Sequence, residues 1–177
     1  DPNNPIPIVM QGKAYVIKSD RVIQEAQQSL SQAIEKGEAN KNATIPPEKT
    51  AEANQLLDTA IERFKRAIEL KQNYFDAHLS LAQTYDKKGD YEKALQEIRV
   101  AVLLAPDNID AAYEMGRIFY NDKKYDEAEK IFQKILENND KYANALYSMG
   151  LIYLQRGDKD QALEMFRKVL ELNPGNQ

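Results

Sequence analysis

Cysteine is absent from the 177 residues, which excludes disulfides and thiolate metal sites. A strong charge of one sign is also lacking, because 24 basic side chains stand against 28 acidic ones and the two signs are interspersed. That balance gives no electrostatic footprint for nucleic acid or for an anionic membrane surface. No apolar run approaches the roughly 18 residues of a membrane-spanning helix. We therefore expect no nucleic-acid partner and no membrane insertion.

Groups that could converge on a reaction centre are equally scarce. The one histidine, His78, is expected to be a packing residue on a helix. There is no glycine-rich loop to hold a phosphate. The Asp/Asn-rich turns at 106–108 and 138–140 lack the glycine and the terminal glutamate of a calcium loop. We therefore expect no catalysis, no metal site and no cofactor.

A single glycosylation sequon is present, Asn42-Ala43-Thr44, although about one such triplet is expected by chance in a chain of this length. It makes Asn42 a candidate glycosylation site and favours an extracellular or cell-surface location over the cytoplasm. The compartment itself stays open. Because the chain begins with Asp1 and not with Met, we expect a processed chain or an excised fragment.

The second half of the sequence repeats with a period of 34 residues. Three copies, which start at His78, Ala112 and Leu146, align without a gap. Each copy carries two apolar stripes at helical spacing, separated by a short polar turn. In the first copy, Gly89 is placed to end the first helix and Pro106 to stop the second. The pattern predicts pairs of antiparallel helices.

These copies resemble the tetratricopeptide repeat family. The best copy supplies the family's pattern at Leu146, Met149, Gly150, Tyr153, Ala162, Phe166, Val169 and Pro174. The resemblance implies an all-α fold, a right-handed superhelical array of antiparallel helix pairs, over residues 74–177. Two positions depart from the pattern: Lys123 stands where glycine is usual, and Asp140 where proline is usual.

Residues 19–73 are expected to form an atypical helix pair with an inserted loop. A first helix is predicted from about Ser19 to Gly37, followed by a loop over 38–45. A second, long helix of about 24 residues is predicted from Pro46 and Pro47 to about Lys71.

Residues 1–18 are predicted to be an extended or β-hairpin arm, with Gln11-Gly12 as its turn. The stretch is rich in apolar and β-branched side chains, namely Ile6, Ile8, Val9, Met10, Tyr15, Val16 and Ile17. Burying them would contribute roughly 10–20 kcal/mol, whereas ordering some 13 residues costs about 13–26 kcal/mol in backbone entropy. Such an arm would need a groove supplied by its own chain or by a neighbour.

The family resemblance implies a binding groove on the concave face, which is lined by the first helix of each repeat. The positions expected there are Leu79, Gln83, Tyr113, Arg117, Tyr120, Tyr147, Leu151 and Leu154. Leu151 and Leu154 are apolar at positions where the family usually carries polar or aromatic groups. We expect them, together with Tyr147, to contact an extended segment or a neighbouring chain.

The last helix is apolar on a face that no further repeat covers. The expected stacking residues are Leu163, Met165, Phe166, Val169 and Leu170. We therefore expect a structural protein, a homo-oligomer in which the arm of one subunit covers the last repeat of the next. The alternative is an adaptor that binds a peptide segment of another protein in the groove. An RNA-binding helical repeat ranks third, because such arrays have a 35-residue period and basic surfaces.

Overall fold

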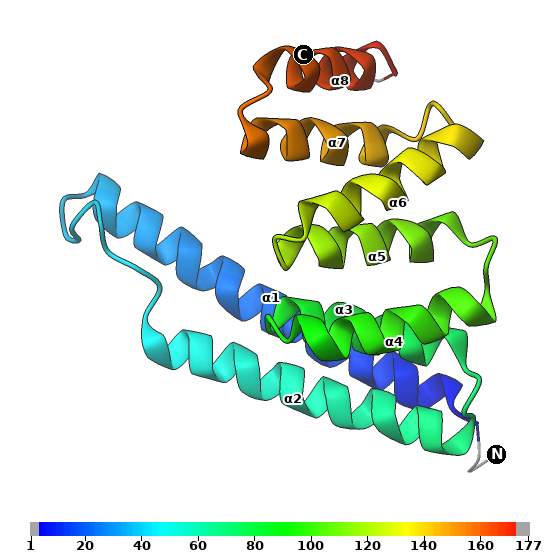
Figure 1. Ribbon diagram of the computed structural model, residues 1–177. Coiled ribbons are helices and arrows are strands. Elements are labelled where there is room, and N and C mark those ends of the chain that lie inside the picture. Colours follow the sequence, from blue (N-terminus) through cyan, green and yellow to red (C-terminus); the bar gives the residue numbers. More distant parts are fainter. Residues whose placement is uncertain (1–3, 173–177) are drawn as a thin grey trace. The chain divides into compact units, whose positions relative to one another are not determined.

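The computed structural model describes residues 4–172, and within this range the chain forms helices and no strand (Figure 1). The helices are α1 (Ile6–Glu35), α2 (Pro47–Leu70), α3 (Phe75–Lys87), α4 (Tyr91–Leu104), α5 (Ile109–Asn121), α6 (Tyr125–Asn138), α7 (Ala143–Arg156) and α8 (Lys159–Leu172). The all-α prediction is confirmed. The three repeats supply the last six helices, each of 13 or 14 residues.

The repeat helices begin and end with ordinary capping chemistry. The Asn108 side chain accepts a hydrogen bond from the backbone N–H of Ala111 at 2.9 Å, which satisfies one of the free donors at the start of α5. Gly89 and Gly157 follow α3 and α7 with φ of 75° and 86°. Lys123 takes the same left-handed conformation, with φ of 60°, at the position where glycine is usual.

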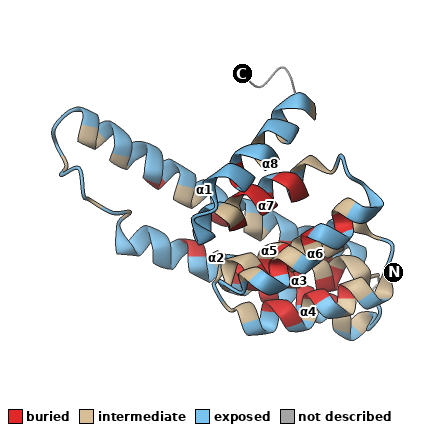
Figure 2. Cartoon of the chain, turned by 45° about the horizontal axis from the view of Figure 1, so that its top comes forward, coloured by how far each residue is buried: buried red, intermediate tan, exposed pale blue. Residues whose placement is uncertain are grey.

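The chain divides into two compact units between Lys88 and Gly89. In the first unit α1, α2 and α3 pack together, and in the second α4 to α8 pack in succession. Phe64 and Leu81 are among the largest fully buried side chains of the first unit, and Phe132 and Ile152 among those of the second. Figure 2 shows the buried residues along the inner faces of the repeat helices.

The predicted extended arm is wrong, because residues 6–18 are the first half of α1. Pro5 precedes the helix and Pro7 lies in its first turn, where proline is tolerated because those N–H groups have no helical acceptor. The Asn4 side chain accepts a hydrogen bond from the Ile6 N–H at 3.0 Å. Val9 is almost fully buried. Tertiary packing therefore outweighs the β-branched composition of the segment.

Gly12 shows how this segment packs against α2. A Cβ atom added at Gly12 would lie 2.5 Å from the ring of Phe64, just as one at Gly116 would lie 2.6 Å from Phe132 and one at Gly150 2.5 Å from Phe166. Gly12 is thus not a hairpin turn. It is the small residue that lets two helices of a repeat approach closely, so α1 and α2 form a helix pair of the same kind as those downstream.

The first pair carries a long insertion. Gly12 and Phe64 are 52 residues apart in the sequence, whereas Gly150 and Phe166 are 16 apart. The 36 extra residues lengthen α1 to 30 residues, α2 to 24 and the loop between them to residues 36–46. The predicted helix start at Ser19 is wrong, because Ser19 lies buried inside α1. Its hydroxyl donates to the Ala53 carbonyl at 3.0 Å. The predicted length of the second helix is confirmed.

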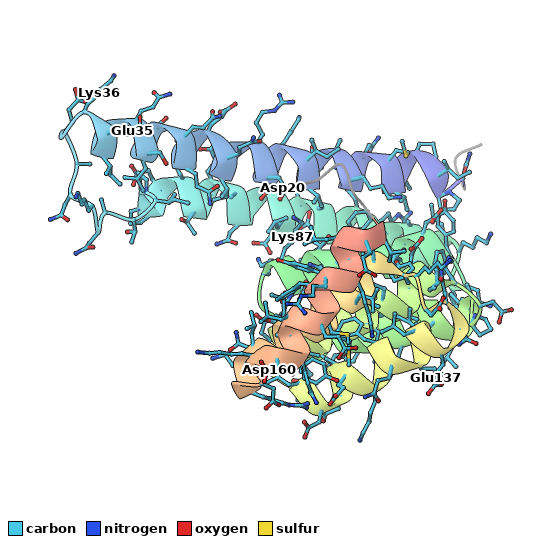
Figure 3. The ribbon with its side chains drawn as sticks, turned by 90° about the horizontal axis from the view of Figure 1, so that it is seen from above. Asp20, Glu35, Lys36, Lys87, Glu137 and Asp160 are labelled. Atoms are coloured by element: carbon cyan, nitrogen blue, oxygen red, sulfur yellow. The ribbon has the colours of Figure 1, made fainter. Side chains whose placement is uncertain are left out.

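The helix pair extends beyond the end of α3, with Glu35 and Lys36 at its tip (Figure 3). Lys87, the last residue of α3, donates to Asp20 of α1 at 2.8 Å, and Lys88 pairs with Asp58 of α2. Past these contacts, the distal residues of both helices are mostly exposed (Figure 2).

Candidate protein-interaction site

One type of contact recurs along the chain: the second helix of one pair packs against the first helix of the next. It occurs between α2 and α3, between α4 and α5, and between α6 and α7. We call this contact the inter-repeat joint. Each joint has an incoming face, on the later helix, and a receiving face, on the earlier pair.

The incoming face consists of small and apolar side chains around the small residue that allows the two helices of a repeat to approach closely. That residue is Ala82, Gly116 or Gly150. Ala77, Ala111 and Ala145, five residues before that residue, are fully buried. Ser148, two residues before Gly150, faces the preceding repeat, because its Oγ lies 3.3 Å from the hydroxyl of Tyr113. The incoming face of a repeat is therefore covered wherever a repeat precedes it.

The receiving face includes apolar residues of both helices of the earlier pair. Ile61 and Leu95, three residues before the buried Phe64 and Ile98, are themselves buried. Tyr113 of α5 packs on Phe132 with ring centroids 5.6 Å apart, and the ring centroids of Tyr113 and Tyr142 are 5.7 Å apart. Tyr142 in turn donates a hydrogen bond to Asp110 at 3.0 Å. These contacts cover the receiving face of the α5–α6 pair.

The same face of the α7–α8 pair is uncovered among the described residues. Tyr147 packs on Phe166 at 5.5 Å, as Tyr113 packs on Phe132. Tyr147 is nevertheless 50% exposed. Leu163, the counterpart of the buried Ile61, is 53% exposed. We call this surface the C-terminal face; it comprises Tyr147, Leu151, Leu154, Leu163, Phe166 and Leu170.

Two of the predicted stacking residues, Met165 and Val169, are less exposed than Leu163 and Leu170. Met165 lines a groove of about 520 Å³ together with Leu136 of α6 and Met149 of α7. Val169 is half-buried. Leu163 and Leu170 remain as exposed large apolar side chains of α8.

The incoming face of α1 is likewise left uncovered by residues 4–172. Pro7 and Ala14 of α1 stand at positions that are buried in α3, α5 and α7. Met10 stands at the position of Ser80 and Ser148, which are buried, and of Glu114, which is half-buried. Yet all three residues of α1 are exposed. Ile6 and Ile17 flank them, and the three large side chains are 55–61% exposed. We call Ile6, Pro7, Met10, Ala14 and Ile17 the α1 face. Of the other predicted arm residues, Val9 is buried, and Ile8, Tyr15 and Val16 are half-buried.

The remaining groove residues lie on α3 and α5. Leu79 and Gln83 of α3 are half-buried. On α5, Arg117 forms an ion pair with Glu114 at 3.1 Å, and the Tyr120 ring lies 5.4 Å from that of Tyr125. Burial, followed by the charge of Tyr125, raises the pKa of Tyr120. These side chains are already engaged by their own unit, in contrast to the C-terminal face.

Three other features complete the surface. Asn42 is exposed in a turn between α1 and α2. His78 is buried, with Nε2 2.8 Å from the Gln72 carbonyl oxygen, as expected of a packing residue. A groove of about 490 Å³ between the distal parts of α1 and α2, lined by Val22, Ala26 and Leu30 with Glu25 and Glu48, was not anticipated from the sequence.

Within residues 4–172, no three His, Asp or Glu side chains are arranged to hold a metal ion. Over the same range, none of the helices combines the length and apolar character needed to cross a bilayer.

Two family models match the sequence. Residues 108–174 match a model described as tetratricopeptide repeat, and residues 53–135 match one described as anaphase-promoting complex, cyclosome, subunit 3. Together they cover the three predicted repeats and the helix before them. No curated protein sequence matches the chain.

Solved structures with the same fold include a crystal structure of MamA, which is 25% identical, with 76% of this chain and 78% of that chain aligned at a TM-score of 0.61. MamA from Desulfovibrio magneticus RS-1 is 22% identical over 94% of this chain and 97% of that chain, with a TM-score of 0.62. Pseudomonas aeruginosa pilF is 22% identical over 90% of this chain and 64% of that chain, with a TM-score of 0.60.

Proposed function

We propose that this chain is a non-enzymatic scaffold that associates head to tail with copies of itself. The proposal is supported by the match of residues 108–174 to the tetratricopeptide repeat model, a repeat fold that serves protein interaction. The α1 face of one copy packs on the C-terminal face of the next. The contact is helical, in place of the extended arm that the sequence suggested.

One observation carries the proposal. Among the described residues, eight large hydrophobic side chains are exposed, and seven of them lie on the two faces. The eighth, Leu103 on α4, stands by itself. Exposed apolar patches on a soluble protein mark interaction surfaces. Here the two patches correspond to the two halves of a joint that the chain already forms three times.

The energy of this contact is modest. If full burial of an apolar side chain contributes about 1.5–3 kcal/mol, seven half-exposed side chains contribute roughly 5–10 kcal/mol. Association itself costs about 4–15 kcal/mol. The balance is at most about 6 kcal/mol, so it predicts a weak, concentration-dependent assembly with a dissociation constant of about 40 μM or higher.

A head-to-tail contact is heterologous, because the two surfaces that meet are different. Each added copy presents a fresh C-terminal face, so growth continues as an open filament unless the rotation between copies closes a ring. The proposal therefore predicts a distribution of sizes that shifts with concentration.

Sedimentation velocity on the intact chain over micromolar to millimolar concentrations tests the proposal. We expect the mean mass to rise with concentration. Replacing Met10 and Ile17 together by Glu should keep the protein monomeric, because two charges would then enter an apolar contact. The matched control is Leu103→Glu, which should assemble like the intact chain.

A second candidate is an adaptor that binds a segment of another protein. It is favoured by Tyr147, Leu151 and Leu154, which form an apolar strip along α7. A monomeric intact chain at millimolar concentration would contradict self-association and leave the adaptor in its place. Glu at Leu151 and Leu154 should weaken either contact without loss of helicity.

A further inference from the structure

Two of the three internal joints are closed by an ion pair of the same kind. Lys88, just after α3, pairs with Asp58 of α2. Arg156, the last residue of α7, pairs with Asp126 of α6 at 2.5 Å and also with Glu129 of α6 at 2.8 Å. In both cases a basic residue at the C-terminal end of the incoming helix binds an aspartate of the receiving helix.

The two pairs occupy equivalent positions. The basic residue lies six residues after the small residue of its helix, Ala82 or Gly150. The aspartate lies six residues before the buried phenylalanine of its helix, Phe64 or Phe132. The joint between α4 and α5 has Glu92 and Asp122 at these positions, and Asp122 pairs instead with Lys124. The ion pair is therefore a feature of some joints and not a requirement of the fold.

The two uncovered faces carry one half of this pair each. Lys18 lies six residues after Gly12 on α1, and Asp160 lies six residues before Phe166 on α8. Both are exposed, and neither has an oppositely charged partner among the described residues. The Lys18 ammonium lies 5.4 Å from the centroid of the Tyr15 ring on the same helix. Asp160 is labelled in Figure 3 at the start of α8.

We propose that Lys18 of one copy pairs with Asp160 of the next, so that α1 docks in the register of an internal joint. This inference rests on the proposed head-to-tail association. The ion pair adds little energy at an exposed site. It fixes direction and register, because only the antiparallel placement that α3 takes on α2 and that α7 takes on α6 brings the two charges together.

The same register places other side chains in familiar partnerships. Ser148 of α7 contacts Tyr113, and Met10 stands at the position of Ser148 on α1, two residues before the close-packing glycine. Met10 of one copy then meets Tyr147 of the next. A thioether against an aromatic ring is a favourable contact. The incoming copy thus supplies the cover that Tyr147 lacks within its own chain.

Charge reversal tests the pair. Lys18→Glu alone and Asp160→Lys alone should each weaken self-association roughly three- to tenfold in sedimentation equilibrium at low salt. The two changes combined in one chain should restore association to within about twofold of the intact chain. The expected losses shrink as salt is added, because the pair is exposed.

Two matched variants control for net charge. Lys36→Glu at the hairpin tip and Glu137→Lys near the end of α6 make the same charge changes away from both faces (Figure 3). They should leave association unchanged. The ion pair is wrong if the double reversal does not restore association, or if the single reversals behave like these controls. Head-to-tail association still stands in that case, provided that the combined change of Met10→Glu and Ile17→Glu blocks association. If the intact chain is monomeric at millimolar concentration, both are wrong.

Discussion

Lys123 is the one residue other than glycine among residues 4–172 with a positive φ. A left-handed backbone costs a residue with a Cβ about 1–2 kcal/mol, a cost that Gly89 and Gly157 avoid at the equivalent turns. We expect Lys123→Gly to raise the free energy of unfolding by about 0.5–1 kcal/mol, measured by urea denaturation. Lys130→Gly, inside α6, should instead lower it by about 1 kcal/mol. A loss of stability in Lys123→Gly would contradict the assignment of strain to this turn.

Gly12 tests whether the start of the chain is a packed helix. A methyl group there would collide with Phe64, so Gly12→Ala should destabilise the first unit by about 1–3 kcal/mol. Gln11→Ala, at an exposed neighbouring position, should change the unfolding free energy by less than about 0.5 kcal/mol. Equal effects of the two substitutions would restore the extended arm as the better description.

Tyr142 gives a pH dependence. Burial, followed by its hydrogen bond to Asp110, raises the pKa of Tyr142 to about 12. The folded state therefore favours the neutral phenol, and this contribution to stability is complete below about pH 10, the pKa of an unfolded tyrosine, and is lost as the pH rises to about 12. We expect Tyr142→Phe to lose less stability than the intact chain between pH 9 and 11.5 in urea titrations. Identical losses in the two proteins would contradict this account.

At the scale of single elements, the repeat helices could be predicted because the 34-residue period places every stripe, turn and small residue in register. The helix α1 could not be found by that period. The insertion separates Gly12 from its packing partner Phe64 by more residues than in the later repeats. A comparison of the sequence with itself at a fixed offset therefore cannot match both residues to their counterparts. The local signal was present in Gly12-Lys13-Ala14-Tyr15, which matches Gly150-Leu151-Ile152-Tyr153. Prolines and β-branched residues suggested a strand because packing partners are invisible in a single sequence.

The C-terminal face shows the opposite case. Its apolar residues could be predicted, because α8 repeats the pattern of buried helices at Leu163 and Phe166. The sequence alone could not predict which of these residues point outward. Met165, for example, lines a groove between helices. The correction of α1 also changes the appropriate experiment. Deleting residues 1–18 would remove Val9 and Gly12 from the core of the first unit, so substitutions on the exposed side of α1 are required.

At the scale of the whole molecule, the central claim is that the α1 face and the C-terminal face bind each other in different copies. One variant is blocked at α1 by Met10→Glu and Ile17→Glu, and the other at α8 by Leu163→Glu and Leu170→Glu. All four positions are exposed, so both variants should keep their helicity by circular dichroism.

Mixing these two variants in sedimentation velocity is the most direct measurement. Each keeps one intact face, so each should be monomeric when alone. In an equimolar mixture the account predicts a species of about twice the 20.2 kDa chain mass that grows no further, because both remaining faces of the pair are blocked. A mixture that stays monomeric where the intact chain assembles, or either variant assembling by itself, would contradict the account.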